Sequence, residues 1–135
     1  LVLGPTYSEY SRELSFSGST QDYYHLNAAD DFSLDVDDLC RVLDNGYDFL
    51  ILCNPNNPTS SAILNGDMEK LLSFCREKDI FVMVDETYAE FAPDIHSVTA
   101  IPFTKTPYGT PRGFQILRCP GTASGIRDYR KQNLS

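Results

Sequence analysis

The feature that most constrains the fold is a pair of short apolar runs with one amphipathic segment between them. Residues Phe49–Cys53 and Ile80–Val84 contain no polar side chain, which is typical of parallel strands that are covered on both faces. The intervening stretch, from about Asp67 to Lys78, predicts a helix. Its apolar face consists of Met68, Leu71, Leu72 and Cys75. This order predicts a right-handed βαβ crossover, and the fold class is therefore α/β with a mainly parallel sheet and flanking helices.

Weaker signals extend this unit toward the N-terminus. An apolar stub at Leu1–Leu3 stops at Gly4-Pro5, and Thr6 is expected to cap a helix that contains Tyr10 and Leu14. The local order is therefore the end of a strand, a turn and a helix.

A second strand and a second helix are expected before the first apolar run. The segment Tyr23–Leu26 is rich in β-prone residues. Ser33 is then expected to cap a helix over Leu34–Leu43, and Asn45-Gly46 is a good C-terminal stop for it.

The last third of the chain has a different residue pattern. Five prolines follow Phe91, and no helical periodicity is visible there. We expect one further strand, at Phe114–Leu117, and no internal repeat divides the chain.

Composition excludes several classes of function. The 135 residues carry a formal net charge of −8, which disfavours binding to nucleic acid or to an anionic membrane surface. No apolar run is long enough to span a bilayer, and no basic region marks a signal peptide at the N-terminus. The four cysteines have no CxxC spacing and no histidine companions, so we expect no metal site, reduced thiols and a cytoplasmic location.

Polar residues follow each of the two buried runs, at the strand ends where α/β proteins bind ligands. Asp85 directly follows the second run, in a partly desolvated place. A carboxylate there needs a cationic or hydrogen-bonding partner. Alternatively, Asp85 caps the next turn. Tyr88 and Asn57 offer a phenol and an amide for one ligand oxygen. Alternatively, Tyr88 is a packed, half-buried aromatic and Asn57 is a turn residue. Glu86 and Glu90 are expected to be solvated.

Two linked motifs carry a resemblance to a known family. Leu52-Cys53-Asn54-Pro55-Asn56-Asn57-Pro58-Thr59 is followed, one helix later, by Val84-Asp85-Glu86-Thr87-Tyr88-Ala89-Glu90-Phe91. This pair resembles the signature of class I/II aminotransferases of fold type I, and within them the histidinol-phosphate aminotransferases and threonine-phosphate decarboxylases. The resemblance implies that the chain is an incomplete large domain of a transferase that depends on pyridoxal 5′-phosphate.

The resemblance also implies roles for individual residues. By position, Asp85 matches the aspartate that pairs with the cofactor's pyridine nitrogen, and Tyr88 and Asn57 match the residues that bind its phenolic oxygen. Pro5-Thr6-Tyr7 resembles the family's turn with a stacking aromatic, so Tyr7 would be the platform for the ring; alternatively, Tyr7 packs in the core.

Two departures from the family pattern stand out. Ser60 occupies the position where the family usually has glycine. Near the C-terminus, Gly125-Ile126-Arg127 echoes the family's phosphate-binding run, which implies that Arg127 contacts the cofactor phosphate. Counting back from Arg127, however, places Cys119 where the Schiff-base lysine belongs, and none of Lys70, Lys78, Lys105 and Lys131 is a credible substitute. The catalytic residue is therefore not assigned.

These departures lead us to expect that residues 1–117 are part of an aminotransferase large domain and that residues 118–135 form a divergent or disordered tail. Truncation or a reading-frame slip near residue 118 is favoured over true divergence. The missing initial methionine suggests that upstream residues are also absent.

The implied activity is transfer of an amino group between an amino acid or amino-acid phosphate and a 2-oxo acid, with a homodimer as the full-length protein. Decarboxylation of an amino-acid phosphate, or a non-catalytic fragment or binding module, are the alternatives. The isolated chain is expected to be inactive and poorly soluble.

Overall fold

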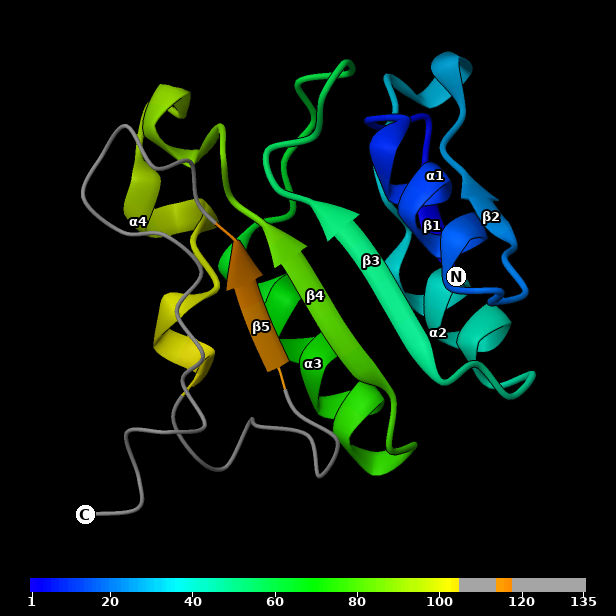
Figure 1. The fold of residues 1–135 in the computed structure, drawn as a ribbon. Helices are drawn as coiled ribbons and strands as arrows, with labels where there is room; N and C mark the ends of the chain where they lie inside the picture. The colour runs from blue at the N-terminus through cyan, green and yellow to red at the C-terminus, as the bar shows by residue number, and fades with distance from the viewer. Residues whose placement is uncertain (105–113, 118–135) are drawn as a thin grey trace, which may run out of the picture.

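A computed structural model describes residues 1–104 and 114–117, and its centre is a five-stranded sheet (Figure 1). The strands are β1 (Val2–Gly4), β2 (Tyr23–His25), β3 (Phe49–Cys53), β4 (Phe81–Asp85) and β5 (Phe114–Leu117). They lie in the order β2-β1-β3-β4-β5, and every neighbouring pair is parallel. The predicted α/β class with a parallel sheet is confirmed.

Helices cover the two faces of this sheet unequally. The α-helices are α1 (Glu9–Phe16), α2 (Val36–Leu43), α3 (Asn65–Glu77) and α4 (Ile95–Val98), with 3₁₀ turns η1 (Ala28–Asp30), η2 (Ala89–Phe91) and η3 (Ile101–Thr104). In Figure 1, α1 lies in front of the sheet at β1, whereas α2 and α3 lie behind it. The chain places β2 on one side of β1 and β3 on the other, so the strand order changes direction between β1 and β3. Sheets of this kind bind ligands beyond the strand ends at such a position.

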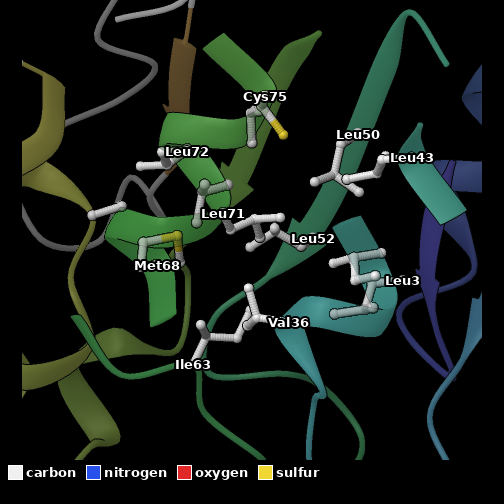
Figure 2. Packing of buried hydrophobic residues seen from close by; sticks show 14 of the residues in the cluster. Leu3, Val36, Leu43, Leu50, Leu52, Ile63, Met68, Leu71, Leu72 and Cys75 are labelled. Carbon is white, nitrogen blue, oxygen red and sulfur yellow. The ribbon is translucent and has the colours of Figure 1, made fainter. Parts of the chain in front are cut away.

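The main core lies between the sheet and the two helices behind it. The side chains of Leu50, Leu52, Val82 and Val84 are fully buried and alternate along β3 and β4 on this face. The predicted apolar face of α3 packs against them and is also fully buried (Figure 2). A buried side chain of this size contributes roughly 1.5–3 kcal/mol relative to an exposed one, so this layer dominates the stability.

The opposite face of the sheet is covered only in part. Tyr10 of α1 packs against Val2, Ile51 and Cys53 in a smaller buried cluster. Farther along this face the rings of Phe49 and Phe81 stack across β3 and β4, with centroids 4.9 Å apart.

Two predicted helix caps are wrong. α1 begins at Glu9 after Ser8, two residues beyond the predicted cap at Thr6, and Ser8 makes no side-chain capping bond. α2 begins at Val36, and Asp35 caps it by accepting a hydrogen bond from the backbone N–H of Asp38 at 3.0 Å. A carboxylate at Asp35 reaches the exposed amides of the first turn, whereas the predicted cap, Ser33, lies too far upstream.

Helical structure also persists beyond Phe91, contrary to prediction. α4 is a single turn, capped by the carboxylate of Asp94, which accepts from the backbone N–H of His96 at 2.9 Å. A single turn contains too few residues to show a helical period, so the sequence pattern could not reveal it. The strand expected at Phe114–Leu117 is present as β5.

Several expectations concern other parts of the chain. Cys40, Cys53 and Cys75 are buried free thiols, as predicted, whereas Cys119 and the expected tail at 118–135 lie outside the described residues. Within the described ranges, no helix has the length and apolar character needed to cross a membrane. No cluster of three or more metal-ligating side chains occurs in that part of the chain either.

Removing a core side chain of α3 should destabilise the chain strongly. We expect Leu72→Ala to lower the free energy of unfolding by about 2–5 kcal/mol, because Leu72 is fully buried and the change leaves a cavity. Leu64→Ala is the matched control, since Leu64 is 55% exposed. Urea unfolding followed by circular dichroism measures both. Equal losses for the two variants would contradict the packing described here.

Stability should also fall in alkaline solution because of Cys75. Burial raises the pKa of this thiol from 9.0 to about 12. The unfolded chain therefore loses the thiol proton first, so the contribution of Cys75 is complete below pH 9 and is lost as the pH rises toward 12. We expect the free energy of unfolding to fall less steeply between these limits in Cys75→Ala than in the unmodified chain. Urea titrations at several pH values measure this, and the same pH dependence of the unfolding free energy in both chains would refute the role of Cys75.

Candidate functional site

The two polar loops predicted to form a site lie side by side at one edge of the sheet. β3 and β4 pair in register up to their last residues, with Cys53 opposite Asp85. The backbone N–H of Asn54 then donates to the carbonyl oxygen of Asp85 at 2.8 Å. The turn after β1 ends at the same edge, and the side-chain amide of Asn56 donates to the carbonyl of Pro5 at 2.7 Å. Three strand ends are thereby tied together.

Asp85 stands at the centre of this arrangement. Its Oδ2 accepts a hydrogen bond from the phenol of Tyr10 at 2.5 Å. Its Oδ1 accepts from the backbone N–H of Thr87 at 2.9 Å and from the Thr87 hydroxyl at 2.6 Å. The carboxylate therefore does cap the following turn, as one alternative held. An ionised carboxylate has about four acceptor positions, so it can still bind a further donor.

Tyr10 is a site residue that the sequence pattern treated only as an apolar position of a helix. It is buried at the inner face of α1, and its hydroxyl reaches across to the end of β4. Burial, and secondarily the bond to Asp85, raise the pKa of this phenol far above its ordinary value. Tyr10 therefore stays protonated and remains a neutral donor. Nothing in the sequence indicated this role beyond the position of Tyr10 three residues after Tyr7.

Asn57 and Tyr88 come together as predicted. The side-chain amide of Asn57 donates to the phenolic oxygen of Tyr88 at 3.3 Å, across a separation of 31 residues. Tyr88 is 40% exposed, so it is not a core aromatic. A phenol and an amide this close can both bind a single ligand oxygen.

Tyr7 projects into solvent from the turn after β1. Its side chain is 50% exposed, which excludes the alternative that it packs in the core. Its ring forms a T-shaped pair with the ring of Tyr10, with centroids 5.9 Å apart and planes at 82°. Tyr10 thus links an exposed aromatic ring to the carboxylate of Asp85.

The expectation that Glu86 is solvated is wrong. Glu86 is only 2% exposed, and its carboxylate accepts hydrogen bonds from the hydroxyl of Thr99 and the backbone N–H of Ala100. The residues that bury it follow α4, a part of the chain for which the sequence predicted no structure. Glu90 is exposed, as predicted.

Ser60 occupies a backbone conformation that favours glycine. Its φ is +60°, in the left-handed region, and its N–H donates to the carbonyl of Asn56 at 2.8 Å. The turn therefore keeps the shape that glycine would adopt easily, although serine occupies the position.

The described lysines do not face this site. Lys70 on α3 forms an ion pair with Asp37 of α2 at 2.6 Å, and Lys78 pairs with Asp44 at the end of α2. Both side chains are exposed on the helical side of the sheet. Lys105, Lys131 and the predicted phosphate ligand Arg127 lie outside the described residues.

A groove of about 690 Å³ adjoins the Asn57–Tyr88 pair. It runs between the loop after β3 and the segment from Tyr88 to Val98, and its apolar lining includes Leu64 and Phe91. Both side chains are exposed to solvent.

The family assignment follows from a match over most of the chain. The family model for aminotransferases of class I and II matches residues 1–112. This chain belongs to that family. The matched range includes the motif residues from Pro5 to Phe91 described above and excludes Cys119 and the run Gly125–Arg127.

Curated relatives agree with this assignment. Histidinol-phosphate aminotransferase from Methanococcus aeolicus is 30% identical over 95 residues, which are 70% of this aminotransferase-family chain and 25% of that protein. Threonine-phosphate decarboxylase from Salmonella typhimurium is 30% identical over 105 residues, 78% of this chain and 28% of that protein. The chain thus spans about a quarter of the length of these relatives.

A solved structure shares the fold. A decarboxylase from Sulfurospirillum multivorans superimposes with a TM-score of 0.75 and 26% sequence identity, covering 96% of this chain and 35% of that one. The described sheet and helices therefore correspond to about a third of that decarboxylase's fold.

Replacing Ser60 by glycine should stabilise the aminotransferase-family chain. A left-handed conformation costs a residue with a side chain roughly 1–2 kcal/mol, and the greater freedom of glycine when unfolded offsets part of this gain. We expect Ser60→Gly to raise the free energy of unfolding by about 0.5–1 kcal/mol in urea titrations. Ser60→Ala is the control and should bring no such gain, because alanine keeps the strain. A destabilised glycine variant would contradict the φ of +60°.

Proposed function

We propose that this chain holds pyridoxal 5′-phosphate at the carboxyl ends of β1, β3 and β4, as part of an enzyme that transfers amino groups. The observation that carries the proposal is Asp85, a strand-end carboxylate held in place by neutral donors beside a converging phenol and amide. These groups differ in chemistry, and each suits a different part of the cofactor.

Asp85 would bind the protonated pyridine nitrogen. When bound, the cofactor supplies an electron sink for the negative charge that develops at the substrate's α-carbon, and it does so best with that nitrogen protonated. Asp85 favours the protonated ring through its negative charge. Tyr10 and Thr87 hold the carboxylate in position without neutralising it, because all their donors are uncharged.

Tyr88 and Asn57 would bind the phenolic oxygen of the cofactor. Their 3.3 Å separation places both donors within reach of one oxygen. Tyr7 would stack on the ring, because its exposed face stands at the same edge of the sheet. Arg127 remains the proposed ligand of the phosphate.

We propose an amino acid or an amino-acid phosphate, with a 2-oxo acid, as substrates of the whole protein. The names of the histidinol-phosphate aminotransferase relatives support this class and a place in amino-acid biosynthesis. A homodimer and a cytoplasmic location are proposed on the same family grounds. The described residues supply no lysine to the site, so the group that moves the proton at the α-carbon is not assigned.

Decarboxylation of an amino-acid phosphate is the second candidate. The relative from Salmonella typhimurium is named a threonine-phosphate decarboxylase, and the Sulfurospirillum multivorans structure is of a decarboxylase. Both reactions would use the same cofactor ligands. A non-catalytic binding module is the third, favoured by the ion-paired positions of Lys70 and Lys78.

Binding of the cofactor in its amine form tests the proposal. Pyridoxamine 5′-phosphate has no aldehyde and so cannot attach to surface lysines. We expect the chain of 135 residues to bind it in equilibrium dialysis, and Asp85→Asn to weaken binding by about tenfold or more, since a charge-assisted hydrogen bond is lost. Asp67→Asn, at an exposed position of α3, is the control and should bind as the unmodified chain does.

Two results would count against the proposal. Failure of the folded, unmodified chain to bind pyridoxamine 5′-phosphate would reject the cofactor site as a whole. Equal affinity for the Asp85 and Asp67 variants would reject the role given to Asp85.

A further inference from the structure

The short segment from Val98, the last residue of α4, to Ala100 is held by polar side chains from two strand ends. Asn54 is the first residue after β3, and Glu86 is the first residue after β4. Both are buried, and both bind this segment, although it is 44 residues away from Asn54 along the chain. Buried polar side chains cost free energy unless they are hydrogen-bonded, so such contacts specify one arrangement.

Asn54 joins three stretches of chain. Its side-chain amide donates to the carbonyls of Ile63 and Val98 at 2.9 and 2.7 Å. Its Oδ1 accepts from the backbone N–H of Ile63 at 2.7 Å. The loop that carries Asn57 is therefore closed at its base and tied to the end of α4.

Glu86 ties the neighbouring loop to the same segment. The hydroxyl of Thr99 lies 2.9 Å from Oε2, and the backbone N–H of Ala100 lies 2.5 Å from Oε1. Thr99 is 6% exposed, and its oxygen also accepts from the backbone N–H of Ile101 at 3.2 Å. One hydroxyl thus donates to the carboxylate and accepts from the turn that follows.

We propose that Thr99 and Glu86 are positioning residues that hold the Asp85–Tyr88 turn in register with the Asn57 loop. The inference rests on the proposed function, in which Asp85 and Tyr88 contact the cofactor. Glu86 lies between them in the sequence, and its carbonyl accepts from the backbone N–H of Ala89 at 3.0 Å, which closes the turn.

The physical consequence is a fixed geometry for two ligand groups. The side chain of Glu86 is anchored in the interior, and this anchor fixes the backbone of the turn that carries Asp85 and Tyr88. A displacement of about 1 Å in a binding group can lower activity strongly. Anchoring at Thr99 therefore matters to the proposed cofactor site, although Thr99 itself does not reach that site. Asn54 provides the corresponding anchor for Asn57.

The test compares Thr99→Val with Thr99→Ser in the full chain of 135 residues. Valine keeps the shape of threonine but removes the hydroxyl, whereas serine keeps the hydroxyl. Without cofactor, amide hydrogen exchange is measured at Thr87 and Ala89, whose N–H groups bond within the turn. With cofactor, pyridoxamine 5′-phosphate affinity is measured for each variant, alone and combined with Tyr88→Phe. Circular dichroism checks that each variant is folded.

The expected results are specific to positioning. Thr99→Val should exchange at Thr87 and Ala89 about fivefold faster than Thr99→Ser and bind about fivefold more weakly, because the hydroxyl's bond to Glu86 is lost. In the Tyr88→Phe background the loss of affinity should shrink to less than about twofold, because interacting sites are not additive. Serine should restore both properties.

Two outcomes would overturn the inference. Unchanged exchange in Thr99→Val would show that the hydroxyl does not hold the turn. An undiminished fivefold loss of affinity in the Tyr88→Phe background would show that Thr99 does not act through Tyr88, as the proposed register with the Asn57 loop requires. If the unmodified chain does not bind pyridoxamine 5′-phosphate, the proposed function fails, while the exchange rates still decide whether Thr99 holds the turn.

Discussion

Five residues of β3 lie beside five residues of β4, from Phe49 opposite Phe81 to Cys53 opposite Asp85. This pairing sets which faces are buried, because a slip of one residue in a strand turns every side chain to the other face. It also sets which loops meet. With this register, the polar residues after each strand begin at the same level, and a bond from Asn54 to the Asp85 carbonyl continues the ladder by one step. Core and site therefore depend on the same interaction.

Much of this arrangement could be predicted because it depends on local pattern and sheet geometry. Two apolar runs and an amphipathic helix are sufficient to predict the crossover, and parallel strands necessarily end at the same edge. The sequence alone therefore predicts that Asp85, Asn57 and Tyr88 lie together. The role of Tyr10 could not be predicted in the same way. Tyrosine fits an apolar helix pattern, while its hydroxyl can donate a hydrogen bond to a distant carboxylate.

The failed predictions depend on tertiary contacts, which a local sequence pattern does not show. Most glutamates are solvated, and the burial of Glu86 is favourable only because Thr99 and Ala100 donate hydrogen bonds to its carboxyl group. Those partners belong to a segment whose helical turn is too short to leave a pattern. The cap of α2 was misplaced because Ser33 and Asp35 are both good caps, and the choice between them depends on where the helix meets the sheet.

The neutral partners of Asp85 have a consequence for ligand selection. Among the described residues, its side-chain hydrogen bonds come from a phenol, a hydroxyl and a backbone amide. None of these donors is charged, so in the proposed cofactor site the carboxylate would discriminate between heteroaromatic rings by their protonation state. A ring that is neutral in water would take up a proton as it binds, and the affinity of the site for it would fall as the solution became more alkaline. In the proposed site, ligand binding and proton uptake would thus be thermodynamically linked through one strand-end residue.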